Sequence, residues 1–277
     1  MVFNPQRINR RESFGHAAAL LGALAAAPRL TWAQQVTRGF DQIAPSSASL
    51  TEQKRQQNLW VLEVHLKPMR MAWVDLPGGR DREQIWYLAY RAVNRPLTGL
   101  TDNDTDPVNE LDPVPQKPLF IPEVTLVTYD DPAMTKPDQV LRDAILPPAV
   151  KVINRIESHR PGEPVLKDSV SSIRPVPDPV ESGSDGEWIY GVATWRGVNP
   201  DTDFFTVILD GFTNGYEKRE NAEGRTELWR KVLVQKFKRP GDRFDPNQAE
   251  FEFVGKPVWE YMPSGAIAAI KKAAAGG

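Results

Sequence analysis

Three aromatic residues between positions 188 and 195 have types and a spacing that suit a binding surface. Trp188 and Tyr190 alternate with Ile189 in the segment EWIYGVATW, so both rings are expected on one face of a strand, and Trp195 lies further along it. Flat aromatic side chains on a sheet stack on sugar rings or anchor a protein interface. Packing between two sheets is the alternative, because tryptophan contributes a large apolar area to a core. We take these three residues as candidate ligand-binding residues.

Asp201 and Asp203 form a second candidate, in the segment NPDTD at 199–203. Two neighbouring carboxylates can act as acid and base in hydrolysis. Asp and Asn side chains in such a turn also commonly bond the adjacent backbone, which would make the pair structural. The sequence identifies no partner for the pair, so both interpretations stay open.

Asp102, Asp104 and Asp106 occupy alternate positions, as the first calcium ligands of an EF-hand loop do. That loop requires a glycine at its sixth position and a bidentate glutamate at its twelfth, where this chain has Pro107 and Pro113. The two prolines count against calcium and favour a solvated acidic loop between strands. We therefore predict no metal ion.

Other residues that could do chemistry are scarce. The chain has no cysteine, which excludes disulfides, thiolate nucleophiles, zinc–thiolate sites and iron–sulfur clusters. Only two histidines, His65 and His159, follow the N-terminal region, and neither has a zinc-type spacing. Phosphate-binding, dinucleotide-binding and nucleophile-elbow motifs are absent from the sequence. We expect no catalytic residue and no cofactor.

The first 33 residues have the composition of an export signal. Arg10 and Arg11 precede the apolar run 17–27, which is too short to span a bilayer as an ordinary helix. Small residues then precede a predicted cleavage site after Ala33. The paired arginines resemble a twin-arginine signal, although the aromatic residue after them lies one position later than in that signal. The sequence predicts an exported protein, in the periplasm, at the cell surface or outside the cell.

Removal of this signal would change the net charge. The full chain has 34 basic and 36 acidic residues and a formal charge of −2, whereas residues 34–277 have 30 and 35 and a charge of −5. A negative balance disfavours a nucleic-acid surface. We expect an envelope protein or a glycan as partner, no nucleic acid, and no membrane span after cleavage.

Apolar and polar residues alternate through much of the chain after residue 58. The segment NLWVLEVHLK at 58–67 places four apolar side chains on one face, as a half-buried strand does. The segment IWYLAYRAVN at 85–94 is apolar on both faces, which indicates a central strand. Many of the 25 prolines lie between such segments. The pattern predicts a mainly β chain with an immunoglobulin-like β-sandwich, either one large sandwich or two in tandem.

The predicted domain organisation has four parts. After the export signal, a linker with a short helix capped by Ser49 leads into the sandwich region, which contains a short helical insertion around 138–158. Because YRAVN at 90–94 matches WRGVN at 195–199 in type, two repeats are one interpretation, and chance similarity of aromatic strands in one sandwich is the other. The boundaries are 1–33 for the signal, 34–57 for the linker, 58–262 for the sandwich region, 58–130 and 187–262 for the two repeats, and 263–277 for a flexible tail.

The segments IWYLAYRAVN (85–94), GVATWRGVNPDTDFFTV (191–207) and GFTNGY (211–216) carry a resemblance to a known group. Together they resemble uncharacterised exported bacterial proteins of planctomycete type, over roughly residues 58–262. The resemblance implies an exported β protein and no particular activity.

These observations lead to one functional hypothesis and two alternatives. We hypothesise an exported, non-enzymatic β-sandwich protein with a binding or structural role in the cell envelope. The alternatives are a carbohydrate-binding module that uses surface aromatics and a secreted hydrolase with an Asp/Glu pair. Exposed tryptophans would favour sugars, facing carboxylates in a cleft would favour hydrolysis, and an unpaired sheet edge would favour protein partners.

Overall fold

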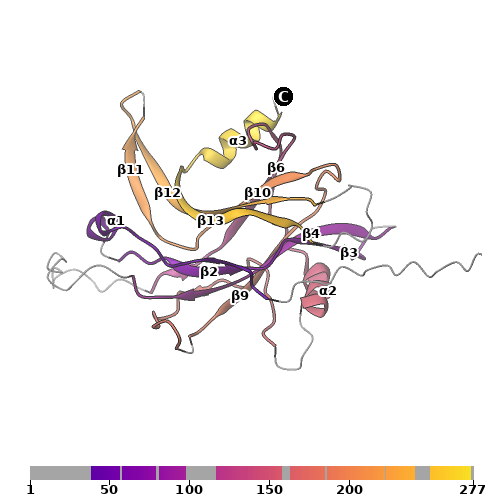
Figure 1. The fold of residues 1–277 in the computed structure, drawn as a ribbon, viewed down its shortest axis with the longest axis horizontal. Helices are drawn as coiled ribbons and strands as arrows, with labels where there is room; N and C mark the ends of the chain where they lie inside the picture. The colour runs from indigo at the N-terminus through magenta and orange to yellow at the C-terminus, as the bar shows by residue number, and fades with distance from the viewer. Residues whose placement is uncertain are drawn as a thin grey trace, which may run out of the picture. The chain divides into compact units, whose positions relative to one another are not determined.

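The computed structural model describes residues 39–56, 58–78, 81–97, 117–157, 163–184, 186–221, 223–240 and 250–275 (Figure 1). All of them belong to one unit, residues 34–277. The export signal, His159 and the calcium candidates Asp102, Asp104 and Asp106 lie outside the described residues, so the expectations about them stay predictions.

The first sheet is built around one long strand, β4, which is paired on both sides as its apolar sequence predicts. Strands β2 and β3 pair one after the other along one edge of β4, and β9 pairs along its other edge. Strand β1 extends the sheet beyond β2, and every pairing between these strands is antiparallel. The bounds are Gln42–Ala44 for β1, Leu62–Leu66 for β2, Arg70–Val74 for β3, Glu83–Asn94 for β4 and Ile189–Trp195 for β9.

The second sheet has six strands, and all their pairings are antiparallel. Their order is β13, β12, β10, β6, β7. Strand β11 pairs with the first part of β12, on the same edge to which β10 pairs further along. A short pair, β5 and β8, lies outside both sheets. The bounds are Leu119–Phe120 for β5, Glu123–Tyr129 for β6, Pro137–Arg142 for β7, Arg174–Pro175 for β8, Phe204–Asp210 for β10, Tyr216–Glu220 for β11, Thr226–Lys238 for β12 and Glu252–Pro263 for β13.

The two sheets share one apolar core. Trp86 of β4 lies 5.2 Å from Phe205 of β10 and 4.5 Å from Phe251, measured between ring centroids. Tyr90 of β4 lies 5.1 Å from Phe212 in an edge-to-face contact. Each of these rings is almost fully buried, and such aromatic pairs stabilise a core beyond their buried area. The mainly β class is confirmed, and two antiparallel sheets on a shared core have the arrangement of a β-sandwich.

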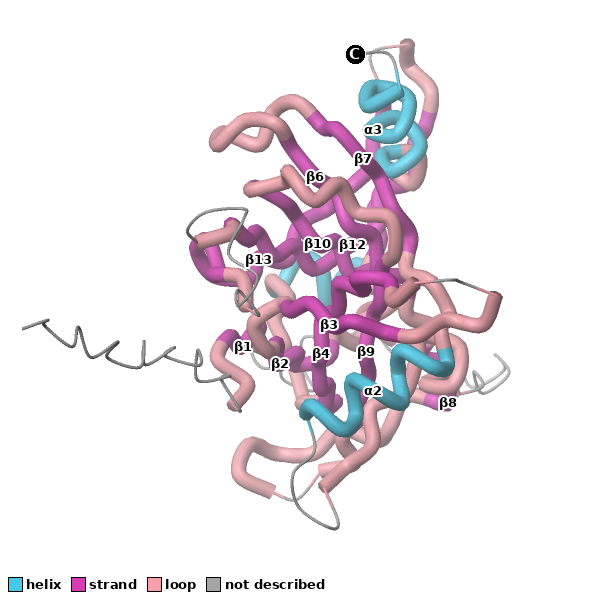
Figure 2. The backbone as a smooth tube through the Cα atoms, turned by 90° about the vertical axis from the view of Figure 1, so that its right-hand side faces the viewer, coloured by secondary structure: helices cyan, strands magenta, loops and turns pink. Residues whose placement is uncertain are grey.

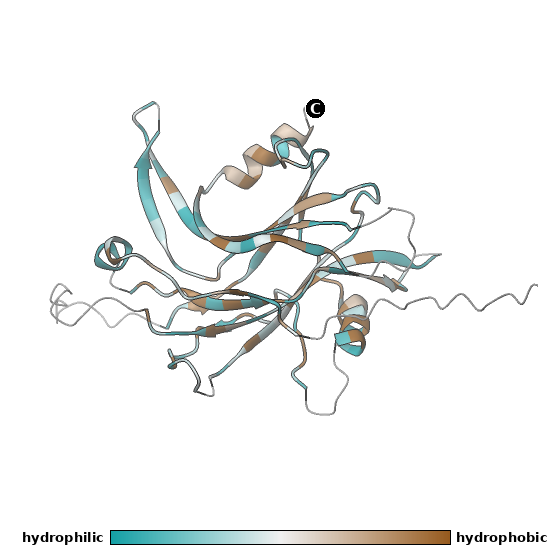
Figure 3. Cartoon of the chain, viewed as in Figure 1, coloured by the Kyte–Doolittle hydropathy of each residue, from teal (hydrophilic) through white to brown (hydrophobic). Residues whose placement is uncertain are grey.

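A helix covers part of the outer face of each sheet. Helix α2, Pro147–Glu157, lies against β3, β4 and β9 (Figure 2) and buries Ala149 and Ile153 there. Helix α3, Ala266–Ala275, packs Ile267 and Ile270 against the second sheet, and Figure 3 shows it as mostly hydrophobic. No helix in the described ranges is long and apolar enough to cross a membrane.

The expected helical insertion around 138–158 is half wrong. Helix α2 accounts for 147–157, but residues 137–142 form strand β7, whose Val140 and Leu141 pair with Val127 and Leu126 of β6. The short segment QVLR fits a helix or a strand by its local pattern, and pairing with the neighbouring strand decides between them. The two prolines at the start of α2 occupy its first turn, where no backbone donor is required.

The expected linker and tail both contain ordered elements. Within 34–57, β1 pairs with β2, and helix α1, Leu50–Arg55, begins at Ser49 as predicted. The Ser49 side chain accepts a hydrogen bond from the Glu52 N–H, and the Glu52 carboxylate accepts one from the Ser49 N–H, which completes a capping box. Within the expected flexible tail, residues 266–275 form α3.

The two segments proposed as repeats are not separate sandwiches. The matching strands β4 and β9 are direct neighbours in the first sheet, whereas the later strands of 187–262 belong to the second sheet. Tyr90 faces Gly191 across this pairing, and a Cβ at Gly191 would lie 2.2 Å from the Tyr90 Cζ. The tyrosine ring therefore requires glycine at this position of β9.

A buried ionic network joins α2 to both sheets. The Glu157 carboxylate accepts hydrogen bonds from the Lys67 Nζ at 2.7 Å, from the Tyr87 hydroxyl at 2.9 Å and from the Arg70 guanidinium. The same guanidinium lies 2.7 Å from a carboxylate oxygen of Glu250, just before β13. The side chains of Arg70 and Glu157 are 2% and 4% exposed, and the nearby cations hold the pKa of Glu157 below its usual value against the effect of burial. A charge buried this deeply is tolerated because it is paired and hydrogen-bonded.

Replacing Glu157→Gln should destabilise the fold by about 3–5 kcal/mol, because it leaves two buried cations without their shared anion. In the wild type, the lowered pKa of Glu157 means that its contribution to stability is present above pH 4.5, the ordinary glutamate value, and is lost as the pH falls below it. Denaturant unfolding at pH 7 and pH 4 measures both effects. Glu220→Gln on the exposed strand β11 is the control, and equal effects of the two substitutions would contradict a structural role for the network.

Gly191→Ala should destabilise the fold by about 1–3 kcal/mol, because the new methyl group overlaps the Tyr90 ring. Gly265→Ala is the matched control, since no atom lies within 4 Å of the added Cβ there. Thermal unfolding of the two variants compares the effects, and a neutral Gly191→Ala would show that Tyr90 can move away.

Candidate functional site

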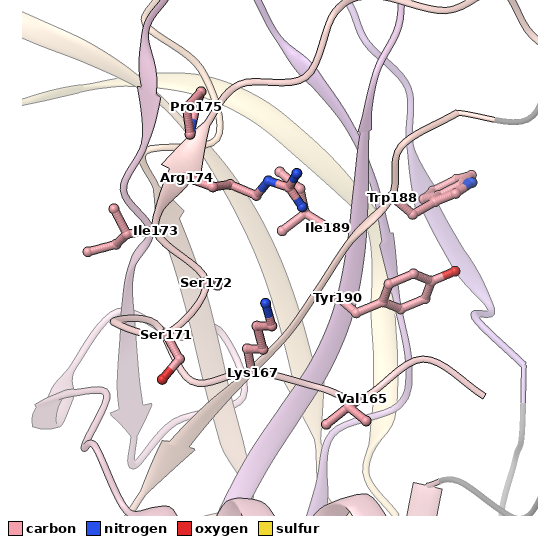
Figure 4. A pocket seen from close by; sticks show the side chains of 10 residues that line it. All are labelled: Val165, Lys167, Ser171, Ser172, Ile173, Arg174, Pro175, Trp188, Ile189 and Tyr190. Atoms are coloured by element: carbon pink, nitrogen blue, oxygen red, sulfur yellow. The ribbon is translucent and has the colours of Figure 1, made fainter. Parts of the chain in front are cut away.

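A cleft of about 340 Å³ lies along the outer edge of β9, where the sequence predicted a binding surface (Figure 4). A larger hollow of about 540 Å³ is bounded by Leu97 and Lys117, next to residues outside the described ranges. The β9 cleft is lined by Val165, Lys167, Ser171, Ser172, Ile173, Arg174, Pro175, Trp188, Ile189 and Tyr190.

The cleft forms because one neighbouring segment pairs with β9 at a single residue. Lys167 lies parallel to Gly191, donating its N–H to the Tyr190 carbonyl at 3.2 Å and accepting from the Val192 N–H at 2.9 Å. The preceding Leu166 is instead held by α2, since its N–H donates to the Asn154 side chain at 2.8 Å. The backbone before Lys167 therefore leaves the edge of β9, and a gap remains beside residues 188–190.

The opposite wall of the cleft is a turn at 168–172 with its own internal hydrogen bonds. The Asp168 carboxylate accepts from the Ser171 N–H at 2.7 Å, and the Asp168 carbonyl accepts from the Ser172 N–H at 2.9 Å. Ser169 donates its hydroxyl to the half-buried Asp143 carboxylate, and partial burial raises the pKa of Asp143 despite this bond. These contacts fix the position of the wall relative to β7 and β9.

Two cationic side chains extend into the space between this wall and β9. Figure 4 shows the Lys167 amino group and the Arg174 guanidinium pointing into it. Arg174 is paired with the Glu187 carboxylate, which lies outside the lining. The residues that line the cleft include no carboxylate and no histidine. This set of groups suits the binding of an anion and offers no acid–base pair for hydrolysis.

Trp188 is held in a stack of alternating rings and guanidinium groups beside the cleft. The Arg91 guanidinium carbon lies 4.2 Å from the centroid of the Trp188 ring and 4.8 Å from that of Phe40. His65 contacts the indole edge-on at 5.0 Å. Arginine over an aromatic face is a favourable cation–π contact, so one face of the indole is already occupied. Tyr190 projects from the same side of β9 as Trp188 (Figure 4).

His65 is nearly buried beneath this stack, although its place in the strand sequence indicated a polar face. Its Nε2 lies 2.8 Å from a Glu63 oxygen, and its Nδ1 lies 3.1 Å from an Arg91 nitrogen. Burial lowers the pKa of His65, and the charges of Arg91 and Arg95 add to this while Glu63 opposes it. The neutral imidazole therefore supports the Trp188 stack at neutral pH.

The other predicted site residues do not join the cleft. Trp195 is fully buried in the core between the sheets, so its expected role as a surface ligand-binding residue is wrong. Asp201 and Asp203 follow the opposite end of β9 and are exposed. The Asn199 side chain accepts from the Asp201 N–H at 3.0 Å, and the Asp203 carbonyl accepts from the Arg239 N–H at 2.7 Å. These bonds are those of a structural turn.

Sequence analysis missed Lys167, Ser171 and Arg174. Lys167 reaches β9 through a parallel pairing between residues 24 positions apart, which no local periodicity reports. The run of polar and small residues around Ser171 has the composition of a loop and points to no ligand.

No protein-family model, curated protein or solved structure matches the chain. The resemblance to exported planctomycete-type proteins therefore stays a prediction. Within the part of the chain that the structure describes, no group of three or more metal-ligating side chains comes together.

His65→Gln should reduce the pH dependence of stability. A histidine with a lowered pKa in the folded state costs stability as the pH falls below 6.5, because the unfolded chain then takes up the proton more readily. We expect the wild type to lose stability between pH 7 and pH 5.5 and the variant to lose less. Urea unfolding across this range measures the difference, and parallel curves for the two proteins would contradict the assignment.

Proposed function

We propose that the chain is an exported, non-enzymatic β-sandwich protein of the cell envelope that binds a segment of another envelope protein in the β9 cleft. The observation that carries the proposal is the combination of an open strand edge with two cations and several apolar side chains, in a lining without carboxylate or imidazole. Export, and the immunoglobulin-like type of the sandwich, enter this proposal as predictions from the sequence.

The composition around the cleft supports a protein partner. Aromatic and arginine side chains are enriched at protein interfaces, and Trp188, Tyr190, Arg174 and Arg91 lie in or beside the cleft. Ile173 adds an apolar side chain that is 43% exposed. A cluster of this kind, next to an edge with unpaired backbone groups, has the features of a recognition surface.

The carbohydrate-binding alternative has less support. Stacking on a sugar requires a free aromatic face, but Arg91 occupies one face of Trp188 and Trp195 is buried. Trp188 and Tyr190 are both half-exposed, so the only free aromatic surface among the three is the other face of Trp188 and the Tyr190 ring.

The hydrolase alternative has one observation in its favour. Glu123 and Asp210 are direct partners across β6 and β10, in a hollow of about 270 Å³ beneath α3, and burial raises the pKa of Asp210. Arg230 lies 3.1 Å from the Asp210 carboxylate, and this ion pair opposes the effect of burial on the pKa of Asp210. The pair is therefore better explained as structural.

A photo-crosslinking amino acid at position 173 tests the proposal in the cells that export the protein. We expect an adduct that a protease degrades and that Lys167→Glu reduces about tenfold, the loss of one charge-assisted contact. The control places the same crosslinker at Leu228, an exposed position on β12. The proposal of a protein partner would be wrong if the two positions gave equal amounts of adduct, or if the adduct resisted protease and was degraded by glycosidases.

A further inference from the structure

We propose that the occupant of the β9 cleft is an extended, acidic segment of polypeptide, one residue of which pairs with the backbone of Trp188 and Tyr190. This inference rests on the proposed function and names the chemistry of the partner.

The backbone of β9 offers the hydrogen bonds for this pairing. Backbone N–H and C=O groups alternate between the two edges of a strand. The bonds of Lys167 to Tyr190 and Val192 show that these groups point away from β4 in the even-numbered residues of β9, and the same alternation extends to Trp188, which directly precedes β9. The Tyr190 N–H and the Trp188 carbonyl therefore point to the open edge. Among the described residues, neither group has a hydrogen-bond partner.

The chain's own residue for this place is displaced. In a regular parallel pairing, the residue two positions before Lys167 would accept from the Tyr190 N–H and donate to the Trp188 carbonyl. That residue is Val165, but Leu166 is held by Asn154 and the Val165 side chain is 65% exposed. One residue of an incoming segment would restore both bonds, which is the addition of a strand to a sheet edge.

The charge of the cleft selects an acidic segment. Lys167 is exposed and, within the described ranges, has no ion-pair partner. Arg174 brings a second cation into the cleft, although Glu187 already neutralises part of it. Since the chain after the signal has a net charge of −5, this cationic site contrasts with the protein as a whole. A carboxylate next to Lys167 would complete a charge-assisted hydrogen bond.

Exposed apolar side chains flank the same edge and suit the alternation of an extended segment. Val165 and Ile173 both line the cleft, at 65% and 43% exposure, Val165 near Tyr190 and Ile173 on the opposite wall (Figure 4). In an added strand, successive side chains point to opposite faces. A segment with alternating acidic and apolar residues would therefore place carboxylates near Lys167 and apolar side chains near Ile173.

Three synthetic heptapeptides test this proposal with the purified protein. The first is acetylated and alternates Val and Glu, the second has the same sequence with every backbone amide N-methylated, and the third has Lys in place of Glu. Isothermal titration calorimetry measures their dissociation constants. We expect the first peptide to bind, the second to bind at least tenfold more weakly because it cannot donate to the Trp188 carbonyl, and the third not to bind.

Protein variants test the same contacts from the other side. Tyr190→Pro removes the outward N–H without removing a bond to β4, and a proline is tolerated at such an edge. Tyr190→Ala is its matched control, and we expect about fivefold to tenfold weaker binding of the first peptide to the proline variant than to the alanine variant. Lys167→Glu should abolish binding, whereas Lys218→Glu on the exposed strand β11 should not change it. The melting temperature of each variant confirms that it is folded.

Four outcomes would overturn the proposal. They are absence of binding by the first peptide, equal binding of the N-methylated peptide, equal affinities of the two Tyr190 variants, and binding of oligogalacturonate, an anionic glycan, with none of the peptides. If any one of these occurs while the crosslink at position 173 stays protease-sensitive and dependent on Lys167, the edge pairing is wrong and the proposal of a protein partner stands. Loss of that crosslink alongside peptide binding would instead overturn the proposed function in the cell.

Discussion

The Glu157 carboxylate, buried between the cations of Lys67 and Arg70, is the interaction on which the arrangement of the chain depends. Arg70 begins β3 just after the break that lets β2 and β3 share one edge of β4, and Glu250 ties the same guanidinium to the entry of β13. Because an isolated charge would be costly in this position, the four side chains must assemble together. Their assembly fixes the end of α2 on the first sheet. Helix α2 in turn holds Leu166 through Asn154, and this bond keeps the neighbouring backbone away from β9. The shape of the cleft therefore depends on a charge cluster that lies outside the lining of the cleft.

Aromatic packing between the sheets is a second stabilising contribution, alongside the aliphatic side chains of the same core. Trp86, Phe205, Phe237 and Phe251 form a continuous group of ring contacts that crosses from β4 to β10 and β12. The sequence has no cysteine, so no disulfide supplements these contacts. A chain of this size can bury enough apolar area for such a core to suffice. The prolines agree with this arrangement, since those inside the β13 and β7 segments lie at strands with one open or weakly paired edge.

Much of the fold could be predicted from residues that act locally, and little of the site could. The alternation around Leu62 and Val64 identified β2, the apolar run of β4 identified a central strand, and Ser49 identified the start of α1. Residues 137–142 were misassigned because a tertiary pairing with β6 decided their conformation. Trp188 and Tyr190 were found by their period of two, whereas Trp195 lies an odd number of positions further on, shares the face of Ile189 and is buried. Which face of a strand meets the core depends on the other sheet, and the cations of the cleft arrive from a segment that pairs only once with β9.

The open edge beside Trp188 and Tyr190 is only one residue long, and this length has a kinetic consequence. Two backbone hydrogen bonds and one charged contact contribute a few kcal/mol at most, against the loss of freedom that binding imposes on a flexible segment. A partner held in this way would dissociate quickly, since weak contacts lower affinity mainly through the rate of release. The site is thus suited to brief, repeated encounters with many copies of a partner. Durable assembly would require several such contacts at once, so the arrangement of partners along a surface would matter more than the strength of any one of them.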